Sequence, residues 1–220
     1  IKEMQRRMGD DALVYVRIFK SPLQEMLYQM MGFEQFSIDY FENRDLFDSL
    51  QSVMFEHYRE IAKIAARTPV EVILIGDNVS SEVVGTERFN NYLIPVYKML
   101  QEEMKGTGKL IGSHMDGRLA SLADAVAAAD LQWIEALTPP PMGDFSLADA
   151  RRLWKDKAMW INYTSNMHIE KPEVIEAHTR EIIEQAGSKK GFLIGITEDA
   201  PIPALERSLA IIQRVIREYS

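Results

Sequence analysis

The chain has 220 residues, no cysteine and a formal net charge of −8. Because nucleic-acid binding favours a basic face, this charge balance argues against a DNA or RNA partner. The lack of cysteine excludes disulfides and thiolate metal sites, and it fits a cytoplasmic protein. No apolar run approaches the roughly 18 residues of a membrane span, and no signal-peptide pattern opens the sequence, so we expect a protein that does not enter the membrane.

Short apolar runs alternate with longer segments of helical periodicity along the chain. We expect strands at residues 12–19, 70–75, 109–113, 133–137, 158–163 and 191–197. We expect helices at residues 46–66, 86–105, 119–129, 147–154, 172–186 and 203–219. Alternating strands and helices predict an α/β fold with a parallel sheet covered by helices. We treat residues 1–220 as a single domain.

Two parallel architectures compete, an open doubly wound sheet and a TIM (β/α)8 barrel. No G-x-G-x-x-G or G-x-x-x-x-G-K-[ST] motif follows a strand, which removes the usual support for a nucleotide-binding sheet. Polar residues instead recur at strand ends, as on the catalytic face of a barrel. They are Arg17, Asp77, Asn78, His114, Asp116, Glu135, Asn162, Glu198 and Asp199. We therefore expect a barrel of which this chain covers roughly the last six strands, the N-terminal strands being missing.

His114 and Asp116 end one predicted strand and are followed at once by Gly117. Side chains in a strand alternate between faces, so these two project the same way. Glu198 follows another predicted strand. Buried polar groups at strand ends need a polar partner, a metal or a ligand, so a site built from several strand ends is expected.

Five motifs occur in a telling order along the chain. They are Ile75-Gly-Asp77-Asn78, Phe89-x-x-Tyr92-x-x-Pro95-x-Tyr97, Ser113-His114-Met-Asp116-Gly117, Ile134-Glu135-Ala-Leu-Thr138-Pro-Pro-Pro141-Met-Gly143-Asp144 and Gly195-Ile-Thr197-Glu198-Asp199-Ala-Pro201. This order resembles the uroporphyrinogen decarboxylase superfamily, from about residue 12 to the end. The resemblance implies a TIM barrel. Within the superfamily the chain resembles a branch with a His-x-Asp-Gly motif, which is nearer to the corrinoid-dependent methyltransferases than to the decarboxylase proper.

The resemblance implies a specific metal site. In the methyltransferase branch a His-x-Cys pair and a later cysteine hold zinc; here His114 and Asp116 occupy the first two positions and Glu198 lies near the third. These three residues are the expected ligands of a divalent metal, zinc foremost. A His–carboxylate hydrogen-bond network that orients substrate without metal is the alternative. The resemblance implies metal-assisted methyl transfer involving a corrinoid or a methoxylated small molecule, with a corrinoid protein as an expected partner. Without cysteine, a methoxy donor whose leaving oxygen is polarised by the metal fits better than transfer to a thiol.

The remaining site predictions concern catalysis and substrate binding. His114, Asp116, Glu135 and Glu198 are the catalytic candidates, although Glu135 could equally form a structural salt bridge. The substrate-binding candidates are Arg17, Asp77, Asn78, Arg118, Met142 and Asn162. The proline-rich loop at 138–144 could be only a stiff connector. The methionine- and aromatic-rich segment 23–41 could line a cavity or pack in the core.

Uroporphyrinogen decarboxylation is the second reading of function. The Gly-Asn-x-Asp-Pro and Gly-His-Gly elements of that enzyme are absent from 162–168 and 195–199. Its polycarboxylate substrate would also be repelled by acidic strand ends. A binding module without turnover is the third reading. A homodimer is a further expectation.

Overall fold

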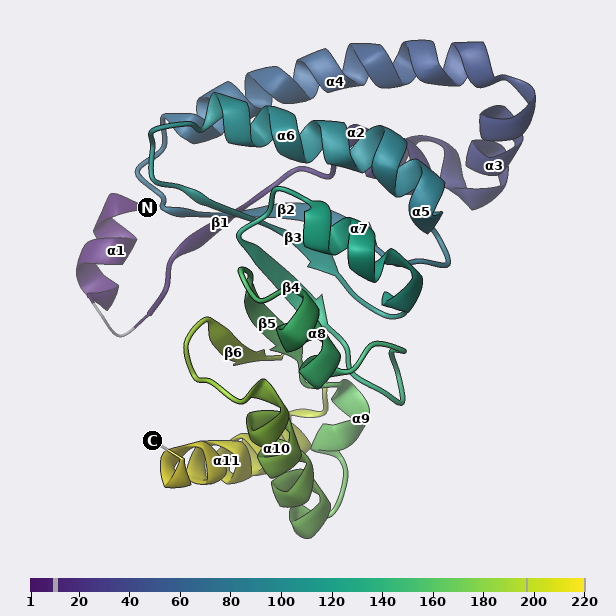
Figure 1. Ribbon diagram of the computed structural model, residues 1–220. Coiled ribbons are helices and arrows are strands. Elements are labelled where there is room, and N and C mark those ends of the chain that lie inside the picture. The colour runs from purple at the N-terminus through teal and green to yellow at the C-terminus, as the bar shows by residue number, and fades with distance from the viewer. Residues whose placement is uncertain (10–11, 197, 220) are drawn as a thin grey trace.

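The computed structural model describes residues 1–9, 12–196 and 198–219, and its centre is one parallel sheet (Figure 1). The strands are β1 (Tyr15–Ile18), β2 (Val72–Val79), β3 (Leu110–Met115), β4 (Trp133–Leu137), β5 (Ala158–Asn162) and β6 (Phe192–Gly195). Each strand pairs with the next one in the chain, and every pair is parallel. A doubly wound sheet reverses its strand order, whereas this order is that of consecutive units of a barrel. The predicted α/β fold, a partial TIM barrel, is confirmed.

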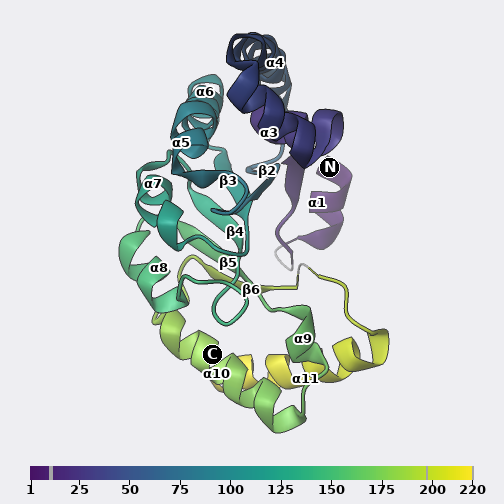
Figure 2. The ribbon, with the colours of Figure 1, turned by 90° about the vertical axis from the view of Figure 1, so that its right-hand side faces the viewer.

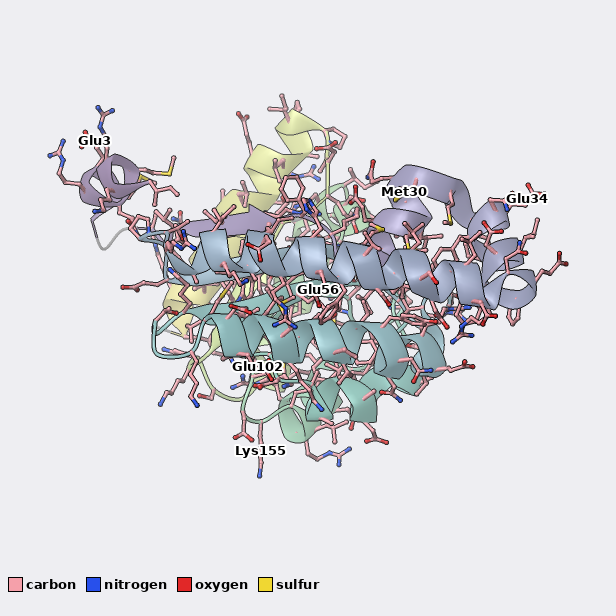
Figure 3. All side chains as sticks on the ribbon, turned by 90° about the horizontal axis from the view of Figure 1, so that it is seen from above. Glu3, Met30, Glu34, Glu56, Glu102 and Lys155 are labelled. Atoms are coloured by element: carbon pink, nitrogen blue, oxygen red, sulfur yellow. The ribbon has the colours of Figure 1, made fainter. Side chains whose placement is uncertain are left out.

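The connecting segments are helical and form an arc outside the sheet (Figure 2). The helices are α1 (Lys2–Met8), α2 (Pro22–Glu25), η1 (Met26–Met31), α3 (Gly32–Glu42), α4 (Arg44–Ala66), α5 (Gly85–Arg88), η2 (Phe89–Leu93), α6 (Ile94–Glu103), η3 (Ala120–Leu122), α7 (Ala123–Ala128), α8 (Leu147–Leu153), α9 (Ser165–His168), α10 (Pro172–Ala186) and α11 (Ile202–Glu218). Seen from above, α4 and α6 lie side by side (Figure 3). None of the helices in these described ranges combines the length and apolarity needed to cross a bilayer.

The main differences from the predicted elements lie at their ends. β2 runs on to Val79 and β3 to Met115, so Asp77, Asn78 and His114 lie within strands. The predicted strand 191–197 ends at Gly195, with Thr197 outside the described residues. The predicted helix 86–105 is three consecutive helical segments, α5, η2 and α6. The structure divides segment 23–41 between two environments, since some of its large side chains are buried and others exposed. Met26, Phe36 and Tyr40 are buried, and Met30, Phe33 and Phe41 are exposed.

The two faces of the sheet have different surroundings. The outer face packs against the helices and forms the main apolar core. On the inner face the indoles of Trp133 and Trp160 stack with centroids 6.3 Å apart. A Cβ on Gly112 would lie 2.4 Å from the Trp133 ring, and one on Gly195 would lie 1.3 Å from Trp160 Nε1. Only glycine therefore leaves room for each indole to lie across the neighbouring strand.

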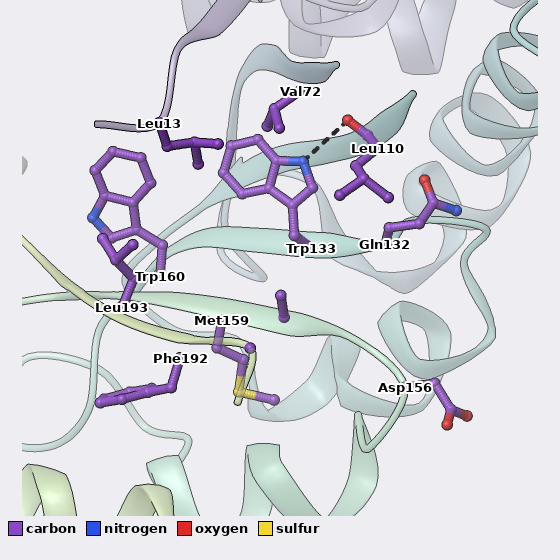
Figure 4. A pocket seen from close by; sticks show the side chains of 12 residues that line it. Leu13, Val72, Leu110, Gln132, Trp133, Asp156, Met159, Trp160, Phe192 and Leu193 are labelled. Atoms are coloured by element: carbon purple, nitrogen blue, oxygen red, sulfur yellow. Dashed lines mark hydrogen bonds between the residues drawn. The ribbon is translucent and has the colours of Figure 1, made fainter. Parts of the chain in front are cut away.

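A hollow of about 510 Å³ opens beside these tryptophans, at the N-terminal ends of the strands (Figure 4). Its walls are mostly apolar and include Leu13, Leu110 and Phe192. Trp133 Nε1 donates to the Leu110 carbonyl at 3.4 Å. The hollow lies at the opposite ends of the strands from the polar residues that the sequence singles out.

Two buried polar side chains tie the second half of the fold together. The Lys157 ammonium donates to the carbonyls of Ala129 at 2.6 Å and Leu131 at 3.0 Å, fixing the approach to β4. His168, which is fully buried, has its Nδ1 2.5 Å from the Ser208 hydroxyl, joining α9 to α11. Burial lowers the pKa of His168 and so favours the neutral imidazole.

Candidate active site

Polar side chains from neighbouring strands meet on the inner face at the C-terminal ends. Alternation along β3 places Gly112 and His114 on the same side, and Gly112 faces the inner-lying Trp133. The β3–β4 register pairs His114 with Glu135. Two of the predicted catalytic residues are therefore cross-strand neighbours at the mouth of the partial barrel.

His114 is held between two carboxylates. Its Nδ1 contacts Glu135 Oε2, and its Nε2 lies 3.6 Å from Asp116 Oδ2. The His114 side chain is 20% exposed and that of Glu135 only 7%. Burial by itself lowers the pKa of His114, but the two carboxylates outweigh it and raise the pKa to about 9. At neutral pH the ring is therefore a cation that carries a proton on each nitrogen.

The backbone directly after Glu135 is strained. Ala136 has a φ of +71°, a left-handed conformation that costs a non-glycine residue about 1–2 kcal/mol. The β4–β5 register shifts at this point, between Glu135 and Leu137. Such strain persists only where the surroundings enforce it, and it is often found at functional sites. Here it lies next to the carboxylate that contacts His114.

Asp77 and Asn78 differ sharply in their surroundings. Asp77 is fully buried, and its Oδ1 accepts from the Ser21 backbone N–H at 2.7 Å. Burial raises the pKa of Asp77 to about 6. Asn78 is half-buried and its Nδ2 donates to the Tyr28 hydroxyl at 3.3 Å. Asp77 therefore holds the turn after β1, and Asn78 is the one of the two that reaches the mouth of the site.

Glu198 lies with a different group of residues from His114. Its Oε1 accepts from Asn162 Nδ2 at 2.8 Å and its Oε2 from the Ser165 backbone N–H at 2.9 Å. These hydrogen bonds join the end of β5, the start of α9 and the loop after β6. Asn162 and Glu198, predicted separately, are therefore partners of each other.

The residues present do not fit the metal set expected from the resemblance. Within the described ranges no three His, Cys, Asp or Glu side chains are grouped so that they could hold a metal ion. The Glu198 carboxylate is engaged by Asn162 and by the Ser165 backbone N–H, so it belongs to a different group of contacts from His114 and Asp116.

Of the remaining substrate-binding candidates, Arg17 lies at the end of β1, where its Nη2 donates to the Gly76 carbonyl at 3.3 Å, and the other two lie outside this cluster. Arg118 is exposed, with its Nε 3.5 Å from a Glu82 carboxylate oxygen. Met142 is 60% exposed in the loop after β4. That loop is anchored by Asp144, whose Oδ1 accepts from the backbone N–H groups of Leu119 and Ala120 at 2.7 and 2.9 Å. The role of the loop seen here is to connect β4 to α8 and to brace the segment after β3.

Sequence reasoning missed two residues at the mouth, Lys20 and Tyr28. The Lys20 ammonium donates to the Gly76 carbonyl at 2.9 Å and lies 5.0 Å from the centroid of the Tyr28 ring. Lys20 lies two residues after the first strand. A cation just after a strand end was the feature of the sequence that could have identified Lys20 as a site residue. Tyr28 gave none, because a tyrosine in a methionine-rich segment is more often a core residue.

Comparison with known proteins agrees with this architecture. Residues 5–216 match the family model described as uroporphyrinogen decarboxylase (URO-D). A solved methyltransferase from Methanosarcina mazei superposes with a TM-score of 0.73 at 14% identity, covering 98% of this chain and 62% of that one. The chain thus spans less than two thirds of that structure, and the likeness concerns the fold. No curated protein matches the sequence. The family match over nearly the whole chain shows that this protein belongs to the uroporphyrinogen decarboxylase family.

Proposed function

We propose that this protein transfers a methyl group from the oxygen of a methoxylated small molecule, with His114 as the general acid. The observation that carries the proposal is the placement of His114 between Glu135 and Asp116 at the mouth of the sheet. A cleaved C–O bond leaves its electron pair on oxygen, and the resulting alkoxide or phenoxide needs a proton. A protonated imidazole held in place can deliver one, and such catalysis contributes about 10²–10⁴-fold to a rate.

The methyl acceptor in this proposal is a reduced corrinoid carried by a partner protein. It enters as a second substrate, because the resemblance places the corrinoid on a separate chain. The methyl group moves to the acceptor, and the substrate oxygen takes the proton from His114. Glu135 and Asp116 keep the ring oriented and stabilise its charge before transfer. A likeness to a methyltransferase fold supports the reaction class without identifying the donor.

The experiment follows methylation of reduced cobalamin by absorbance, with methoxylated aromatic compounds as donors. We expect turnover by the wild type and a loss of about 10²-fold or more in His114→Gln. His57→Gln, which changes an exposed histidine on α4, is the matched control and should keep its activity. A chelator should leave the rate unchanged. Full activity in His114→Gln would refute the proposal, and loss of activity on chelation would restore the zinc hypothesis.

Porphyrinogen decarboxylation is the second candidate, favoured by one observation. Arg17 is exposed on β1, and in the described part of the chain no acidic side chain forms an ion pair with it. A polycarboxylate substrate would need such an available cation. Incubation with uroporphyrinogen, followed by oxidation and separation of the porphyrins by chromatography, tests it directly. Loss of carboxyl groups from the product would favour this candidate over methyl transfer.

A further inference from the structure

Two cationic side chains converge on a single carbonyl oxygen at the mouth of the site. Arg17 Nη2 donates to the Gly76 oxygen at 3.3 Å, and Lys20 Nζ donates to the same oxygen at 2.9 Å. Across the described residues, neither cation has a carboxylate within ion-pair distance. The carboxylates of Asp77, Glu25 and Asp116 attract Lys20 only from beyond ion-pair distance. One neutral carbonyl cannot balance two positive charges, so this corner favours a further anion.

The backbone is built to bring these cations together. Gly76 has no side chain, and a Cβ there would lie 2.8 Å from both Arg17 Nε and the Ile18 carbonyl. Any other residue would push the guanidinium away. The hydrogen bond from the Ser21 N–H to the buried carboxylate of Asp77 fixes the turn that carries Lys20. The carbonyl that both cations contact belongs to a buried glycine, and the turn that carries Lys20 is fixed by a fully buried carboxylate, so the pair is more than two mobile surface charges.

Tyr28 adds an oriented hydroxyl to this corner. Its ring lies 5.0 Å from the Lys20 ammonium, and its oxygen accepts a hydrogen bond from Asn78 Nδ2 at 3.3 Å. Because that bond occupies a lone pair, the phenolic proton is left to donate to a ligand. Tyr28 is 40% exposed and stands on the π-helical turn Met26–Met31, a type of turn frequent at functional sites.

We propose that Lys20, Arg17 and Tyr28 form a subsite that binds a carboxylate of the substrate. This inference rests on the proposed methyl transfer and names its substrate class, a methoxylated carboxylic acid in preference to a neutral ether. Charge-assisted hydrogen bonds from an ammonium, a guanidinium and a phenol match the lone pairs of one carboxylate. Tyr28 contacts Asn78, and the carbonyl of the next residue, Val79, accepts from the Asp116 N–H at 3.1 Å, so the subsite adjoins the residue that flanks His114.

The test compares two probes of nearly the same shape, 4-methoxybenzoate and 4-methoxybenzamide. Their dissociation constants are measured by calorimetry with no methyl acceptor, so that binding is separated from turnover. We expect the wild type to bind the benzoate at least about tenfold more tightly, a difference of about 1.4 kcal/mol. Lys20→Gln should lose this preference and Lys20→Arg should retain part of it. Lys98→Gln, an exposed change on α6, should leave the preference unchanged.

The outcomes separate the subsite from the reaction. Equal binding of the two probes by the wild type would overturn the subsite. So would an undiminished preference in a Lys20→Gln protein whose circular dichroism and melting temperature match the wild type. A preference that depends on Lys20 supports the subsite even if no methyl transfer is found, and in that case only the proposed reaction fails. Methyl transfer without any preference for the benzoate would refute the subsite alone.

Discussion

Replacing Glu135 by glutamine tests whether carboxylates hold His114 as a cation. The change keeps the size of the side chain and an oxygen that can accept from Nδ1, but it removes the charge in contact with the ring. Burial alone would place the pKa of His114 below its ordinary value of 6.5, and the carboxylates raise it to about 9. Removing one close opposite charge typically lowers the pKa of a cation by about 1–3 units. We expect the pKa of His114 to fall by at least about one unit in Glu135→Gln. Asp116, which stays in place, should account for the part of the upward shift that remains.

The same shift predicts a pH dependence of stability. A raised pKa in the folded state contributes stability that is fully present below pH 6.5 and is lost as the pH rises through about 9. The move from 6.5 to about 9 corresponds to about 3 kcal/mol, since one unit is 1.36 kcal/mol. Urea unfolding at pH 6.5 and 9.5 should show this loss in the wild type and a smaller loss in Glu135→Gln.

Histidine NMR gives the direct reading, because the chain has only four histidines. The His114 signal is assigned by its absence in His114→Gln. Glu102→Gln, at an exposed position on α6, is the charge-matched control and should leave the His114 pKa unaltered. A wild-type His114 that titrates near 6.5, or one whose pKa is the same in Glu135→Gln, would refute the reasoning.

Three further changes probe the fold. Lys157→Met should lower the free energy of unfolding, measured in urea, by about 2–4 kcal/mol, because two buried carbonyls lose a charged donor. Lys155→Met, at an exposed position nearby, is the control and should change that free energy little. Gly195→Ala should cost at least about 1–3 kcal/mol through its clash with Trp160, and adding Trp160→Ala should not add its own full cost; additive losses would contradict the clash. The lowered pKa of His168 means that its stabilising contribution is present above pH 6.5 and lost as the pH falls, so the melting temperature should drop toward pH 5, and less so in His168→Gln.

The strands could be predicted because each one is a short apolar run bounded by polar or glycine residues. Alternation also placed His114 and Asp116 at one end of one strand. The contact of His114 with Glu135 required the register between β3 and β4, and a single sequence does not contain that register. For Asp77 and Asn78 the parity was ambiguous, and an irregularity in β2 between Ile75 and Val79 settles it only in three dimensions.

Contacts between residues far apart in the sequence determine which other side chains belong to the site. Glu198 was expected beside His114 because the family resemblance puts it near the third ligand position, but its carboxylate accepts hydrogen bonds from Asn162 and from the first N–H of α9. Lys20 was missed because it stands in a turn with no motif. Its importance comes from Gly76, a residue far away in the chain whose missing side chain lets two cations approach one oxygen.

The stacked tryptophans on the inner face give this protein a natural optical reporter. The chain has only three tryptophans, and two of them, Trp133 and Trp160, lie nearly parallel at an interplanar angle of 19°. Transitions of two indoles this close couple, so the pair should contribute a two-signed band to the circular dichroism spectrum. The third, Trp154, is buried on the helical side of the sheet and lies apart from the pair. Loss of that band without loss of helical signal would reveal opening of the inner face while the outer layer remains folded.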